Sequence, residues 1–176
     1  ATINQAVIDW MDGGTAQTTV TQTYGCIADW DTSIVTNMNC LFAHSGCPSY
    51  GVNKEEALNF NSDISSWDVS NVKYAQNMFQ NAYAFNIDIS NWNVGKLLIS
   101  FRMFYFAEKF NQDVSKWDVS KVNSMAQMFK RASKFKQLWC SASWTASAFS
   151  SEDLIDTNAN MICCDRGQKF NVFGNS

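Results

Sequence analysis

The chain has 176 residues, of which 46% are hydrophobic and 16% are charged. This composition excludes intrinsic disorder and suffices for one sizeable hydrophobic core in a single domain. The formal net charge is -3 and the pI is near 5.0, so the chain has no basic field for binding nucleic acid or an anionic membrane surface. No apolar run reaches 18 residues, which predicts that the chain has no transmembrane segment.

The cysteine content and the first residue bear on the compartment. An even number of cysteines favours an oxidising environment, and their spacing matches no zinc motif. The chain begins at Ala1 without a signal-like apolar segment, which we interpret as a processed mature chain. We expect an extracellular, cell-surface or organelle-lumen location. The six cysteines are Cys26, Cys40, Cys47, Cys140, Cys163 and Cys164.

Residues 1–26 are predicted to form a helical cap. Thr2 can accept a hydrogen bond at the start of a helix, and Gly13 and Gly14 can end it. The apolar residues between them fall on one helical face. They are Ile3, Ala6, Val7 and Trp10.

Residues 27–138 repeat with a period of 25. Three complete rows are FNSDISSWDVSNVKYAQNMFQNAYA from Phe60, FNIDISNWNVGKLLISFRMFYFAEK from Phe85 and FNQDVSKWDVSKVNSMAQMFKRASK from Phe110. An earlier row enters at Ile27, and a fifth begins at Phe135. One such unit cannot cover its own apolar face, so neighbouring rows must stack.

Each row predicts a short strand, a turn and a short helix. Trp67 and Val69 alternate as in a strand, and Ser70 marks a turn. The spacing then becomes helical, at Val72, Ala75, Met78, Phe79 and Ala82. We therefore predict an α/β fold: a short leucine-rich-repeat-like solenoid with strands in a parallel sheet and helices outside. One tryptophan of each row falls on the inward-facing side of the predicted strand. We therefore predict a buried column rather than a sugar-binding platform for Trp30, Trp67, Trp92 and Trp117.

The segment 43–59 is an insertion, since Phe60 follows Phe42 by 18 positions where Phe85 follows Phe79 by 6. It is either a recognition loop or an insertion that the surface tolerates. A disulfide between Cys40 and Cys47 would pin it. Residues 139–176 are predicted to form a C-terminal cap in which Cys140 pairs with Cys163 or Cys164.

The row FN-x-DIS-x-WDVSNV…MF…A, over about residues 24–137, resembles the BspA-like leucine-rich repeat surface proteins, also called DUF285 or the lipoprotein-associated surface repeat family. YGCIADWDTSIVTNMNCLF from Tyr24 resembles the first repeat of such proteins in marine unicellular algae and other microbial eukaryotes. The resemblance implies a surface role in adhesion and protein binding, and it supplies no catalytic residues. The insertion, the apolar third repeat and the Cys-bearing tail depart from the family pattern.

The third repeat carries the main candidate site. Large apolar residues stand where the preceding row has Lys73, Tyr74, Gln76, Gln80 and Asn81 and the next has Asn123, Ser124, Ala126, Lys130 and Arg131. On a helix face that should be solvated, they predict a partner-binding patch. The alternative is that the tail or the 43–59 loop covers them. The candidate residues are Leu98, Ile99, Phe101, Tyr105 and Phe106.

Acidic and amide side chains form two further columns. Asp31, Asp68, Asn93 and Asp118 are predicted to project from the open sheet face, either as a ligand-binding surface or as a solubilising one. For Asp63, Asp88 and Asp113 we favour turn capping over calcium binding.

No arrangement for catalysis is evident, because there is one His, no G-x-S-x-G motif and no glycine-rich phosphate loop. We predict no enzyme activity, no metal and no cofactor. The predicted function is a non-catalytic protein-binding or structural module, a subunit or linker that docks on a larger protein assembly, either membrane-associated or not. The alternative is a secreted or cell-surface adhesion module that binds carbohydrate or protein through the polar sheet face.

Overall fold

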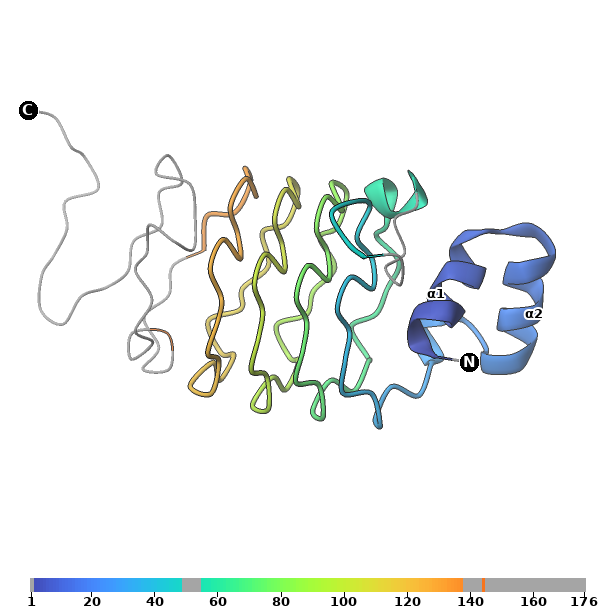
Figure 1. Ribbon diagram of the computed structural model, residues 1–176, viewed down its shortest axis with the longest axis horizontal. Coiled ribbons are helices and arrows are strands. Elements are labelled where there is room, and N and C mark those ends of the chain that lie inside the picture. Colours follow the sequence, from blue (N-terminus) through green and yellow to red (C-terminus); the bar gives the residue numbers. More distant parts are fainter. Residues whose placement is uncertain (1, 49–54, 138–143, 145–176) are drawn as a thin grey trace, which may run out of the picture.

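The computed structural model describes residues 2–48, 55–137 and 144. Two helices, α1 (Ile3–Met11) and α2 (Gly14–Tyr24), form the N-terminal end. The chain then winds into coils that stack side by side in sequence order (Figure 1). Two short 3-10 helices, η1 (Ile27–Asp29) and η2 (Glu55–Asn59), belong to the first coil. We number the coils by the repeat rows: coil 1 (27–59), coil 2 (60–84), coil 3 (85–109) and coil 4 (110–134).

The predicted helix at the N-terminus is confirmed. The Thr2 hydroxyl accepts a hydrogen bond of 3.3 Å from the Gln5 N–H, and α1 ends just before Gly13, whose φ is +68°. Helix α2 was not predicted. Its sequence is rich in threonine, whose branched side chains disfavour helices. It is stabilised by packing of Val20, which is buried, and by a left-handed Gly25 at its end.

The prediction of strand-turn-helix repeats is wrong. Among the described residues no strand is present and no α-helix lies within the coils, so the leucine-rich-repeat-like solenoid with its parallel sheet is not formed. Isolated parallel bridges link the coils at one column, which contains Asn37, Tyr74, Ile99 and Ser124.

Left-handed residues prevent the helix that the spacing predicted. Asn77 and Asn81 have φ of +56° and +61°, which no α-helix tolerates. Local hydrogen bonds instead close four-residue turns, as from the Met78 N–H to the Ala75 carbonyl at 3.3 Å. A series of such turns places buried residues three or four apart, as a helix does.

Every second backbone N–H group of these turns donates a hydrogen bond to a backbone carbonyl of the next coil. The Asn77 N–H donates to the Phe101 carbonyl at 2.9 Å, and the Phe79 N–H donates to the Met103 carbonyl at 2.8 Å. Coil 3 bonds coil 4 in the same way. We call the turn segments 36–44, 73–82, 98–107 and 123–132 the ladder, and their outward side chains the ladder face.

The predicted burial of the tryptophan column is confirmed, although the column is not part of a strand. From the second coil on, the indole N–H donates to a carbonyl of the preceding coil: Trp67 to Ile27 at 2.7 Å, and Trp117 to Ile89 at 3.1 Å. The Trp30 indole N–H donates to the Gly25 carbonyl at 3.2 Å instead. Trp144 donates to Val114 at 3.2 Å, so the column continues past the last predicted repeat position.

Stacked phenylalanines form the centre of the core. Phe104 is fully buried, and its ring lies 5.4 Å from the Phe79 ring and 5.3 Å from the Phe129 ring, nearly parallel to both. A second column packs against the first, with the Phe110 ring 4.1 Å from that of Phe104. Neighbouring coils are therefore held by both ring stacking and backbone hydrogen bonds.

Candidate docking surface

The five apolar residues predicted as a patch do lie together on the ladder face of coil 3. The face is not a helix surface, but residues 25 apart in sequence do lie side by side in neighbouring coils. Lys73, Leu98 and Asn123 are joined in this order by backbone hydrogen bonds of 2.9 Å and 2.8 Å. All five side chains are half-buried rather than fully exposed. We call this set the coil 3 patch: Leu98, Ile99, Phe101, Tyr105 and Phe106.

Arginine side chains lie among the patch rings. The Arg102 guanidinium lies 4.9 Å from the ring centroids of both Phe101 and Tyr105, and its Nε donates to the Gln127 side chain at 2.7 Å. The Arg131 guanidinium lies 5.7 Å from the Phe106 centroid. Aromatic rings and arginine are the residues most enriched in the energetic centres of protein interfaces. The sequence comparison had not included Arg102 in the site.

Phe106 occupies a backbone position that does not suit it. Its φ is +57°, and the same left-handed place holds Asn81 in coil 2 and Arg131 in coil 4. A left-handed conformation is unfavourable for a bulky residue and much less so for asparagine. A large ring at a place where asparagine would be less strained motivates the hypothesis that Phe106 serves binding and not folding.

We expect Phe106→Asn to change the free energy of unfolding by less than about 1 kcal/mol, because relief of backbone strain offsets the lost ring contacts. Chemical denaturation of wild type and variant measures this. A loss above about 2 kcal/mol would show that Phe106 serves the fold and would remove the strain argument for a functional ring.

The ladder face is free of acidic residues. None of the segments 73–82, 98–107 and 123–132 contains Asp or Glu, while they contain Lys73, Arg102, Lys130 and Arg131. The overall charge of -3 therefore conceals a basic and aromatic surface. Such a surface complements an acidic, partly apolar one.

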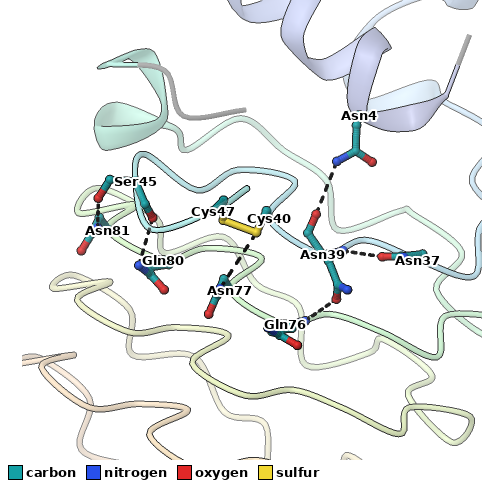
Figure 2. Close-up of a disulfide and its surroundings, with 10 residues drawn as sticks. All are labelled: Asn4, Asn37, Asn39, Cys40, Ser45, Cys47, Gln76, Asn77, Gln80 and Asn81. Atoms are coloured by element: carbon teal, nitrogen blue, oxygen red, sulfur yellow. Dashed lines mark hydrogen bonds between the residues drawn. A yellow bond between two sulfur atoms is a disulfide. The ribbon is translucent and has the colours of Figure 1, made fainter. Parts of the chain in front are cut away.

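The predicted disulfide between Cys40 and Cys47 is confirmed, with the Cα atoms 6.0 Å apart (Figure 2). It folds the start of the insertion onto coil 2. The Ser45 carbonyl accepts from the Gln80 side chain at 2.9 Å, and the Ser45 hydroxyl accepts from the Asn81 side chain at 2.7 Å. Gly46, with φ of +82°, lies so close to Gln80 that an added Cβ would overlap the amide.

The described part of the insertion covers coil 2 rather than the coil 3 patch. Asn77 and Gln80 are buried beneath it, although both lie on the outward side of the ladder. The patch side chains in the next coil remain half-exposed. The insertion thus forms a border of the patch, and the alternative in which these loop residues cover it is not what the structure shows.

The acidic columns cap turns. The Ser65 N–H donates to the Asp63 carboxylate at 2.9 Å, and Asp88 and Asp113 accept in the same way, which confirms the prediction for this column. The column of Asp31, Asp68, Asn93 and Asp118 makes the equivalent bonds, so these residues lie in exposed turns and not on a sheet face. Binding of a ligand there remains a prediction.

These turns depress carboxylate pKa values. Hydrogen bonds from the Ser120 side chain and N–H lower the pKa of Asp118, and Ser65 lowers the pKa of Asp63 likewise. The stabilisation exists above the ordinary carboxyl value of 3.8 and is lost as the pH falls through the lower folded-state values.

We expect the thermal midpoint to be flat from neutral pH to about pH 5 and to fall below it. Asp118→Asn, which copies Asn93 of coil 3, should keep the turn. Its thermal midpoint should fall less than that of the wild type when the pH is lowered. Melting curves of both proteins at several pH values measure the effect. An identical acid response would contradict a role for this turn.

The remaining predictions concern the C-terminal residues, the cysteines, metal binding and membrane spans. The C-terminal cap of residues 139–176 and the pairing of Cys140 with Cys163 or Cys164 lie outside the described residues. Cys26 is exposed and free. Among the described residues, no cluster of three or more His, Cys, Asp or Glu side chains could hold a metal. Neither α1 nor α2, the α-helices of the described part, is long and apolar enough to cross a membrane.

The family membership follows from the repeat region. A family described as "Mycoplasma protein of unknown function, DUF285" matches residues 14–144, which include α2 and all four coils. No curated protein and no solved structure matches the chain. The match covers most of the 176 residues and extends to the last tryptophan of the buried column, Trp144. The chain belongs to the DUF285 family.

Proposed function

We propose that the chain is a non-catalytic protein-binding module that docks an acidic, partly apolar protein surface onto the coil 3 patch. The observation that carries the proposal is the replacement of polar side chains by large apolar ones on the ladder face of one coil only. The rings are preorganised by the ladder backbone and interleaved with Arg102, which suits an interface centre. The disulfide supports an oxidising compartment, such as the cell surface or an organelle lumen.

The repeat itself supplies the best test variant. Replacing the five patch residues by their coil 4 equivalents, L98N/I99S/F101A/Y105K/F106R, removes the apolar surface and keeps residues that the ladder already accepts. Size-exclusion chromatography with light scattering on a native extract should place the wild-type chain in a complex and the five-fold variant at 19.8 kDa. Equal behaviour of the two proteins would overturn the proposal.

A matched control excludes a general effect of surface aromatics. Tyr83 is 40% exposed and lies outside the patch, and the same place holds Ser133 in coil 4. Tyr83→Ser should leave complex formation unchanged. Loss of the complex in this variant would show that the assay reports surface hydrophobicity and not docking at the patch.

A further inference from the structure

A second apolar surface lies at the N-terminal end of the stack. It is a groove of about 690 Å³ between the start of α1, the end of α2 and coil 1. Ile34 on its rim is 85% exposed and Tyr24 is 46% exposed. The place of Ile34 holds Asn71, Lys96 and Lys121 in the later coils, so the groove, like the patch, departs from a polar repeat position.

The groove has the opposite charge to the patch. Asp29 and Asp31 line it, and no Lys or Arg does. The part of the chain around the groove is also acidic, because residues 1–53 contain four Asp and no Lys or Arg. Coils 2 to 4 with residues 135–137 contain ten Lys and Arg against six Asp and Glu. Because the coils stack in sequence order, the acidic and basic parts lie towards opposite ends of the described stack (Figure 1).

We propose that the groove of one copy receives the coil 3 patch of a second copy, so that the chain associates head to tail. This inference rests on the proposed function and names its partner. The patch provides rings and Arg102, and the groove provides Tyr24, Ile34 and the two carboxylates. The two surfaces differ and lie on different coils, so after pairing one copy keeps a free patch and the other keeps a free groove. Such a contact adds copies in an open chain unless a ring closes.

Two repeat-derived variants test the head-to-tail contact. Ile34→Lys copies Lys96 and removes the groove rim, while Phe106→Asn copies Asn81 and removes part of the patch. In sedimentation of the purified wild-type chain, the mass should rise with concentration and rise less in high salt. Each variant alone should associate at least about tenfold more weakly than wild type.

The decisive sample is an equimolar mixture of the two variants. Ile34→Lys keeps an intact patch and Phe106→Asn keeps an intact groove, so the mixture should form a species of twice the monomer mass and nothing longer. Tyr83→Ser should behave as wild type. If the mixture stays monomeric while wild type associates, or if Ile34→Lys associates as wild type does, the head-to-tail contact is wrong.

The outcome separates this inference from the proposed function. A wild-type chain that is monomeric at every concentration, yet enters a larger complex that the five-fold variant loses, would overturn self-association and retain docking of another protein. A chain whose patch variants change neither self-association nor complex formation would overturn both.

Discussion

Phe104→Ala is expected to lower the free energy of unfolding by about 3–5 kcal/mol. The Phe104 ring is fully buried between Phe79 and Phe129 in one column and against Phe110 in the other. Removing it leaves a cavity that the stacked coils cannot fill, because the ladder hydrogen bonds fix their spacing. A loss of this size is a large part of the stability of a single domain. Urea denaturation followed by tryptophan fluorescence measures it.

Phe101→Ala is the matched comparison, since Phe101 lies in the same coil but on the ladder face, half-buried. Ala126 already occupies the equivalent place in coil 4. The expected loss is about 1 kcal/mol or less. Similar losses at Phe101 and Phe104 would contradict the division between a core column and a docking surface.

Removing the disulfide with C40S/C47S is expected to cost about 2 kcal/mol, the loop-closure estimate for so short a loop. Cys40 is buried at a left-handed position, and the bond holds residues 43–48 over Asn77 and Gln80. Without it the loop gains freedom and these amides gain access to water. The variant should also become accessible to proteases within residues 43–48.

The double variant is preferable to a reducing agent, because the chain has four further cysteines. Denaturation of the variant against wild type, both without reductant, gives the stability change. The coil 3 patch lies outside the disulfide loop, so docking should survive. Stability equal to wild type would contradict the role of the disulfide in holding the insertion.

The repeat period, the buried columns and the common place of the candidate patch residues on one coil could be predicted from the sequence. The 25-residue period fixes which residues stack, so the comparison that located Phe101 and Phe106 is independent of the secondary structure. The burial of Trp117 and the turn bonds of Asp113 follow from residue type and phase.

The secondary structure within the repeat could not be predicted in the same way. Successive four-residue turns and helices place apolar residues at nearly the same intervals, and the difference rests on left-handed residues such as Asn77 and Arg102. Asparagine hints at that conformation, but arginine and phenylalanine do not. Trp67 and Val69 alternate as a strand does, yet the Trp67 backbone N–H closes a local turn to Ile64 at 3.1 Å.

The groove at the N-terminal end was also missed, for a different reason. It arises where α2 meets coil 1, and α2 was not expected from its threonine-rich sequence. The exposed Ile34 could have been found by the column comparison that found the patch, since Asn71 and Lys96 hold its place in later coils.

Site-specific photo-crosslinking tests the central claim most directly. A photoreactive phenylalanine derivative at position 105, in the patch, is compared with one at position 83, on an exposed place outside it. We expect crosslinks from position 105 to a protein segment that carries both acidic and apolar residues. Four further changes beside the probe, L98N/I99S/F101A/F106R, should abolish these crosslinks. Equal crosslinking from both positions, or crosslinks from position 105 only to residues 139–176 of the same molecule, would contradict it.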